Sequence, residues 1–113
     1  MMADIFGQVI LNVWAAGNYV FERPVWLERY DIEAEPTVNE SIAFKDGMVI
    51  NGGFGGRIWL TADRDKAHKF ASAAEAMAAW GAVSKTRPVR PDGRPNKPLT
   101  ALSIHVEPAA HGR

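Results

Sequence analysis

The stretch RIWLTADRDKAHKFASAAEA, residues 57–76, indicates the fold class of this chain. Its first residues are rich in β-branched and aromatic side chains, which is typical of a strand. Thr61 or Asp63 can then cap a short first helix. Ser72, with Glu75 three residues later, forms a capping box for a second helix. We therefore predict a strand followed by two consecutive helices.

The second helix is expected to present an apolar stripe to the sheet, because its apolar residues recur at helical spacing. These residues are Ala73, Ala76, Met77, Trp80 and Val83. Pro88 ends the helix, since a residue before proline disfavours the helical backbone. In the first helix, Ala67 and Phe70 lie three residues apart and can face the same core. Together with Trp59, these side chains are expected to pack both helices onto one face of a sheet.

Strands are also expected before this stretch. Residues 8–14 are rich in β-branched and aromatic side chains. Gly17 and Asn18 supply a turn, because both tolerate positive φ. Residues 19–21 then predict the return strand, and Pro24 marks this part of the chain as an edge or a bend.

Residues 25–33 alternate in a way that predicts a further strand. The more apolar set is expected to face the core, namely Trp26, Glu28, Tyr30 and Ile32. The other set is expected to face away from it, namely Val25, Leu27, Arg29 and Asp31.

A hairpin is predicted at Asp46-Gly47, which lies between the apolar residues 41–44 and 48–50. Residues 99–107 alternate and predict the final strand. These elements indicate an α+β fold in a single domain, residues 1–113. The predicted architecture is an antiparallel sheet of about five to seven strands, with two consecutive helices packed on one face.

The composition is that of a small globular domain. The chain has 113 residues, of which 47% are apolar and 23% are charged, enough for a modest core. It has no cysteine, which excludes disulfides, thiolate zinc sites and cysteine nucleophiles. No apolar run approaches the length of a membrane span, and no secretory signal is visible. We expect a cytoplasmic protein without membrane association.

The net charge is zero, but the charges are unevenly distributed. Residues 22–40 carry six carboxylates against two arginines, a balance of four negative charges. Residues 85–98, the basic segment, carry five cations against one carboxylate, a balance of four positive charges. The four prolines of this segment favour an extended polyproline II conformation. Both a stiff solvated linker and a binding surface for an acidic partner fit this pattern.

A protein partner is expected, and its candidate binding residues are Trp26, Arg87, Arg90, Arg94 and Lys97. Tryptophan and arginine dominate interface hot spots. Trp26 is expected to be the exposed tryptophan, because the strand around it is acidic and alternating. The basic segment has no aromatic residue to stack on bases, which disfavours nucleic acid as the partner. A strand edge near residues 19–21 that lacks a partner could pair with the same edge of a second copy, so a symmetric homodimer is also possible.

The glycine-rich hexad, residues 51–56, is the first candidate for a ligand site, since bare backbone N–H groups can approach an anion closely. It lacks the common phosphate-loop patterns and precedes a strand, so a flexible connection is the simpler interpretation. The histidines show no metal-ligand spacing and the serines lack a nucleophile elbow. We therefore assign no catalytic residue, no metal and no cofactor.

One sequence pattern resembles a known group of proteins. It comprises Trp59, Asp63, Ala67, Phe70 and the pair Glu75-Ala76. This W-x-x-x-D-x-x-x-A-x-x-F run with its E-A helix, over residues 41–83, resembles small phage and prophage proteins. Many such proteins have no assigned activity, so the resemblance implies an origin more than a reaction.

Two functional hypotheses from different classes follow. The preferred one is a non-enzymatic interaction protein of phage or prophage type that binds a host protein through a charged face. An inhibitor of a bacterial defence system, such as an anti-CRISPR protein, would be one instance. The alternative is a ligand- or nucleic-acid-binding module that uses residues 52–57 and the basic segment.

Overall fold

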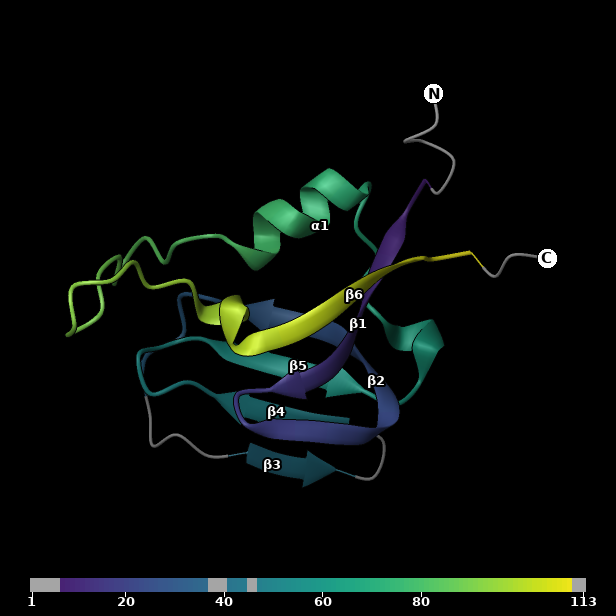
Figure 1. Ribbon diagram of the computed structural model, residues 1–113, viewed down its shortest axis with the longest axis horizontal. Helices are drawn as coiled ribbons and strands as arrows, with labels where there is room; N and C mark the ends of the chain where they lie inside the picture. The colour runs from purple at the N-terminus through teal and green to yellow at the C-terminus, as the bar shows by residue number, and fades with distance from the viewer. Residues whose placement is uncertain (1–6, 37–40, 45–46, 111–113) are drawn as a thin grey trace.

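The computed structural model describes residues 7–36, 41–44 and 47–110, which form one antiparallel sheet of six strands in the order β3-β4-β5-β2-β1-β6 (Figure 1). The strands are β1 (Val9–Ala16), β2 (Tyr19–Asp31), β3 (Ser41–Phe44), β4 (Gly47–Asn51), β5 (Arg57–Thr61) and β6 (Leu102–Pro108). The α+β class and the antiparallel sheet predicted from the sequence are confirmed. β3 and β4 pair as predicted, with Phe44 opposite Gly47. Asp46 of the predicted turn lies outside the described residues.

Within the described residues, the chain after β5 forms one α-helix, so the prediction of two consecutive helices is wrong. α1 spans Ala73–Trp80, and the region of the predicted first helix holds only a 3-10 turn, η2 (Arg64–Lys66). Beyond η2 the chain bonds to the sheet. Phe70 N–H donates to the Val9 carbonyl at 2.8 Å, and the Phe70 carbonyl accepts from Val9 N–H at 2.9 Å. This pairing uses backbone groups that a continuing helix would need.

The Ser72 half of the predicted capping box at the start of α1 is confirmed. Ser72 is the N-cap, and its Oγ accepts a hydrogen bond from Glu75 N–H at 3.1 Å, which satisfies one N–H group that a helix start leaves without a partner. The Glu75 carboxylate reaches one residue further back than the motif requires, since Oε1 accepts from Ala71 N–H at 3.2 Å.

The helix ends earlier than its apolar stripe predicts. Gly81 occupies the C-cap directly after Trp80, so Val83 lies beyond the helix and is exposed. Ala76 is the fully buried residue of α1. Trp80 Nε1–H donates to the Leu102 carbonyl at 3.0 Å, which ties the end of α1 to the start of β6.

The core lies between the inner face of the sheet and α1, which runs beside β1 and β6 in Figure 1. It also includes Leu99 of a second 3-10 turn, η3 (Pro98–Ala101), so the final strand begins later than predicted. The buried cluster consists of Val9, Leu11, Val13, Leu27, Ile58, Leu60, Phe70, Ala76, Leu99 and Leu102. None of the described helices has the length and apolar character needed to cross a bilayer.

A β-bulge in β2 changes which side chains reach the core. Leu27 pairs with Leu60 and Arg29 pairs with Trp59, so Glu28 is an extra residue between the two pairs. Leu27 is fully buried and the Tyr30 side chain packs on the same cluster. The predicted orientation of Tyr30 is therefore confirmed, whereas that of Leu27 is wrong, because strict alternation does not allow for an inserted residue.

Trp59 does not pack a helix onto the sheet as predicted. Its neighbours Ile58 and Leu60 belong to the core cluster, so Trp59 faces the opposite side of β5. There the guanidinium of Arg29 lies 4.0 Å from the Trp59 ring centroid, and that of Arg57 lies 6.0 Å from it. Cation–π contacts therefore cover this ring.

The first half of β2 is an edge, as the position of Pro24 predicts. β5 pairs only with residues 26–31 of β2. In the described residues, Tyr19, Val20 and Val25 pair with β1, and residues 21–24 lie in an irregular stretch where the register shifts between Val13 and Ala15. Pro24 cannot donate a backbone hydrogen bond, so it fits a strand segment that lacks a second neighbour.

Candidate functional site

The glycine-rich hexad folds as a compact turn with its own backbone hydrogen bonds. Gly52 N–H donates to the Gly56 carbonyl at 3.0 Å, and Gly55 N–H donates to the Gly52 carbonyl at 3.1 Å. Gly56 N–H donates to the Ala34 carbonyl at 2.8 Å. Arg57 Nε–H closes the turn from outside by donating to Asn51 Oδ1 at 2.8 Å. Three N–H groups of the hexad are thus occupied and are not available to cradle an anion.

Gly56 brings the hexad against the second 3-10 turn. Its φ is +96°, which favours glycine, and a Cβ atom placed there would lie 2.8 Å from Pro98 Cβ. The close approach of these two backbones depends on the absent side chain. The hexad and the end of the basic segment therefore lie in direct contact.

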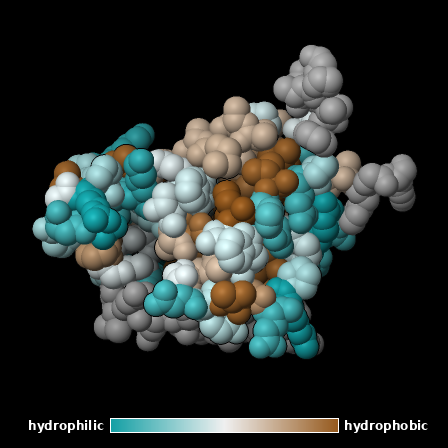
Figure 2. All heavy atoms as spheres, viewed as in Figure 1, coloured by the Kyte–Doolittle hydropathy of each residue, from teal (hydrophilic) through white to brown (hydrophobic). Residues whose placement is uncertain are grey.

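The basic segment doubles back on itself and does not extend as a polyproline rod. Val89 and Pro95 form an antiparallel bridge. Arg90 N–H donates to the Arg94 carbonyl at 2.8 Å, and Gly93 turns the chain with a φ of +87°. This turn and its cross-chain bonds outweigh the extended preference of the prolines. The basic segment lies at the left of Figure 1, and Figure 2, in the same view, shows mainly hydrophilic residues there.

Asn96 joins the basic segment to the hexad. Its side chain is buried, and Nδ2 donates to the Phe54 carbonyl at 3.0 Å and to the Arg87 carbonyl at 2.9 Å. Its own backbone N–H donates to the Pro88 carbonyl, and its carbonyl accepts from Ser84 N–H, both at 2.9 Å. One buried amide thus fixes two segments that lie far apart in the sequence.

Glu33, just after β2, holds the start of the basic segment. Its carboxylate accepts from Lys85 N–H at 2.7 Å and from the Ser84 hydroxyl at 2.9 Å. It also accepts from the hydroxyl and the N–H of Thr86, at 2.6 and 3.0 Å. The Lys85 N–H, followed by the two Thr86 donors, lowers the pKa of Glu33 from 4.5 to about 2.

The stability of the protein should depend on pH through Glu33. Because its folded pKa lies below the unfolded value, the contribution is fully present above about pH 5 and is lost as the pH falls from 4.5 toward 2. We expect Glu33→Gln to lose less stability than the parent protein across that window. Urea denaturation at a series of pH values measures this, with Glu35→Gln as the control that keeps the parent slope. Identical slopes for Glu33→Gln and the parent protein would contradict the assignment.

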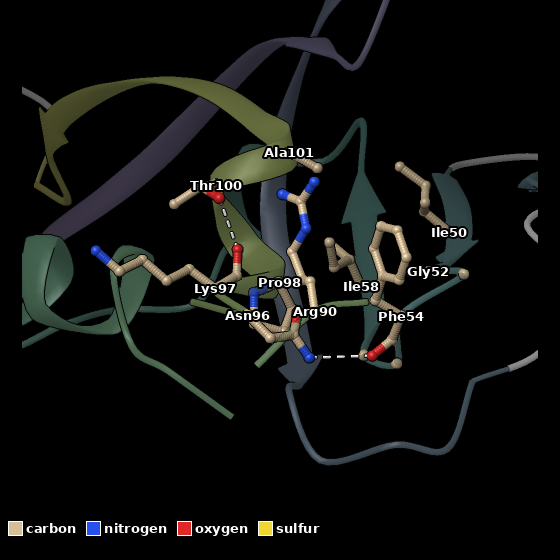
Figure 3. Close-up of a pocket in the computed structure, with 13 residues that line it drawn as sticks. Ile50, Gly52, Phe54, Ile58, Arg90, Asn96, Lys97, Pro98, Thr100 and Ala101 are labelled. Carbon is tan, nitrogen blue, oxygen red and sulfur yellow. Dashed lines mark hydrogen bonds between the residues drawn. The ribbon is translucent and has the colours of Figure 1, made fainter. Parts of the chain in front are cut away.

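A pocket of about 420 Å³ lies between the hexad and the basic segment. Figure 3 shows the Arg90 side chain entering it beside the ring of Phe54, with Ile58 behind them. The lining residues are Ile50, Gly52, Gly53, Phe54, Gly55, Gly56, Ile58, Arg90, Asn96, Lys97, Pro98, Thr100 and Ala101. The size, the mostly apolar wall and the cationic side chains are those of a small ligand site.

Arg90 is held in the pocket by two contacts. Its guanidinium carbon lies 5.0 Å from the centroid of the Phe54 ring, and Nη2 donates to Asp92 Oδ2 at 2.8 Å. The Arg94 N–H, together with the charges of Arg90 and Arg94, lowers the pKa of Asp92, which favours its anionic form. Arg90 Nε is buried and has no acceptor among the described residues. An unpaired buried donor of this kind is unusual in proteins.

The other predicted cations contribute less to the pocket. Lys97 lines it, but Figure 3 shows its ammonium pointing away from Arg90. The Arg94 side chain is 77% exposed and lies 3.9 Å from Asp92. Arg87 is half-buried, and its Nη1 donates to the Thr86 hydroxyl at 3.3 Å. Of the four cations, Arg90 and Lys97 therefore line the pocket, and Arg87 and Arg94 do not.

Trp26 is not the exposed tryptophan, and it does not line the pocket. It is half-buried, and its Nε1–H donates to Glu107 Oε1 at 3.1 Å, while Glu107 also lies 3.5 Å from Arg64 Nε. Trp14 is the tryptophan with the exposed side chain, at 46%. A role of Trp26 in partner binding stays a prediction.

The histidines of the described residues take part in aromatic contacts. His68 lies edge-to-face against Phe70, with centroids 4.5 Å apart, and against Tyr30 at 5.7 Å. His105 lies 6.4 Å from Trp14. In the described part of the chain, no group of three histidine, aspartate or glutamate side chains is arranged to hold a metal ion.

Comparisons with protein-family models, with curated proteins and with solved structures gave no match. The resemblance to phage and prophage proteins thus stays a prediction, and the candidate site is defined by its own geometry alone.

Proposed function

We propose that this protein is a non-catalytic binding module that takes an anionic group on an apolar body in the pocket between the hexad and the basic segment. The observation that carries the proposal is Arg90, which lines the pocket with a partly exposed guanidinium that lies over the Phe54 ring. The proposed function corresponds to the alternative hypothesis from the sequence, a ligand- or nucleic-acid-binding module, in its ligand-binding form.

The pocket supplies both kinds of interaction that such a ligand needs. Arginine is well suited to carboxylates and phosphates, because its planar donors match their oxygens. Nε itself is covered, so a ligand oxygen binds the part of the Arg90 guanidinium that stays open, since the side chain is 32% exposed. Ile50, Ile58 and Pro98 offer apolar surface for the body of the ligand.

The positive balance of the basic segment supports an anionic ligand, since a local excess of one charge attracts the opposite one. The hexad contributes walls and not a phosphate cradle, because the N–H groups of Gly52, Gly55 and Gly56 already donate to carbonyls. Binding to a bacterial host protein, and with it the anti-CRISPR instance, stays a prediction that no contact described above tests.

The proposal is tested with a matched pair of small probes, 4-phenylbutyrate and its neutral amide. The readout is the Nε–H signal of Arg90 in nitrogen-15 NMR spectra, which burial protects from exchange with water. We expect the carboxylate to shift this signal with a Kd on the order of 1 mM, which is typical of a fragment-sized ligand. The amide should bind about ten-fold more weakly or not at all.

Two variants separate the pocket from general charge. Arg90→Gln should abolish binding of the carboxylate, whereas Arg94→Gln should retain it, because Arg94 is largely exposed and does not line the pocket. Both variants lose one positive charge. Equal binding by the two variants, or no shift of the Arg90 signal with the carboxylate, would overturn the proposal.

A further inference from the structure

A second hollow continues the pocket along the inner side of the sheet. Its volume is about 680 Å³, and it shares Ile50, Ile58 and Ala101 with the pocket. We call the two together the groove. Arg90 lies at one end, and Tyr19 and Phe21 lie at the other, with their rings edge-to-face at 5.0 Å. The groove is thus cationic at one end and aromatic at the other.

The aromatic end of the groove lies at a free strand edge. β5 reaches only residues 26–31 of β2. Of residues 19–25, Tyr19, Val20 and Val25 pair with β1, and the described structure gives residues 21–24 no strand partner. The first residues of this edge are apolar and open to solvent, with Tyr19 58% and Val20 62% exposed, and the charged Glu22 and Arg23 follow Phe21. Backbone groups without a strand partner are a template for the addition of another strand.

We infer that the ligand is an extended peptide segment of a partner protein. Its acidic side chain pairs with Arg90, and a large apolar side chain lies among Tyr19, Phe21 and Met48. The segment also forms backbone hydrogen bonds with the free edge of β2. This inference rests on the proposed function and specifies the chemical class of its ligand.

A peptide is favoured over other ligands because it matches all three features of the groove. Strand addition supplies backbone hydrogen bonds, and alternate side chains supply specificity. A fatty acid would place its carboxylate at Arg90 and its chain along the apolar wall, but it offers nothing to the backbone groups of residues 19–25. A second copy of this chain could pair through the same edge without using Arg90.

The test uses short threonine-rich peptides, acetylated and amidated at their ends. Each carries one glutamate and one phenylalanine, at increasing separations and in both orders along the peptide. In the matched set, glutamine replaces the glutamate. We expect one separation to bind best and about ten-fold more tightly than 4-phenylbutyrate, because a second contact adds to the first. The best peptide should shift the amide signals of residues 19–25 and the Nε–H signal of Arg90.

Variants at the two ends of the groove test its extent. Tyr19→Ala should weaken the best peptide about ten-fold and leave 4-phenylbutyrate binding unchanged. Trp14→Ala is the matched control, since Trp14 is an exposed aromatic residue that does not line the groove. Methylation of alternate backbone nitrogens of the peptide should weaken binding in one of the two alternating sets, because one set faces the β2 edge. Thermal unfolding confirms that each protein variant is folded.

The outcomes separate this inference from the proposed function. If 4-phenylbutyrate binds at Arg90 but no peptide shifts residues 19–25, the peptide inference is wrong and the proposed function stands. Tighter binding of laurate than of every peptide would overturn the inference in favour of a lipid-like ligand. Concentration-dependent dimerisation that shifts residues 19–25 and excludes the peptide would overturn it in favour of a second copy.

Discussion

Leu27→Ala is expected to lower the free energy of unfolding by about 2–5 kcal/mol, measured by urea denaturation. Leu27 is 0% exposed and belongs to the core cluster, with Leu60 opposite it on β5. Truncation removes its apolar contacts and leaves a cavity that the neighbouring strands cannot fill. The expected loss is a large part of the stability of a domain of this size.

Val20→Ala is the matched control, because Val20 lies in the same strand and is 62% exposed. Its expected cost is below about 1 kcal/mol, since little buried surface is lost. The comparison tests the bulge at Glu28 directly. Strict alternation through β2 would turn Leu27 away from the core, and equal losses for the two variants would contradict the register described above.

Asn96→Asp is expected to lower the free energy of unfolding by about 3 kcal/mol, because two carbonyls lose their donor and face a buried carboxylate oxygen instead. These are the carbonyls of Phe54 and Arg87. Since Asn96 fixes Phe54 beside Arg90, we also expect binding of 4-phenylbutyrate to fall about ten-fold or more. Urea denaturation and the Arg90 NMR signal measure the two effects.

Asn18→Asp makes the same chemical change at an exposed turn position. Its expected effect on the free energy of unfolding is within about 0.5 kcal/mol, since aspartate fits turns as asparagine does. If Asn96→Asp cost no more than this control, the buried amide would not be what joins the basic segment to the hexad.

The helical region shows how far local patterns predict this fold. The capping box of Ser72 and Glu75 depends on residues three apart, and the structure contains its Ser72 half. The predicted first helix depended on Ala67 and Phe70 sharing a face. In the structure Phe70 instead pairs with Val9, the first residue of β1, which is far from it in the sequence. A local pattern cannot show whether the backbone groups of a segment form a more stable structure by bonding within a helix or by bonding to a distant strand.

The candidate site was predictable in its parts and not in its assembly. The hexad and Arg90 were both identified from sequence, for separate reasons. Asn96 was missed, because its neighbours carry only the turn signals common to asparagine and proline. Glu33 was counted only among the carboxylates of residues 22–40, because its role depends on donors more than fifty positions away. The groove was missed because its walls come from separate strands and turns.

The sequence by itself determined the strands, the hairpin between β3 and β4, the cap of α1 and the glycines of the hexad. Each of these depends on residues within a few positions of one another, so local geometry suffices. The tertiary structure decided the bulge at Glu28, the end of the first helical region at Phe70, the folding back of the basic segment and the meeting of Arg90 with Phe54. These features depend on contacts between distant residues, whose packing and hydrogen bonds outweigh local preferences that differ by only fractions of a kcal/mol.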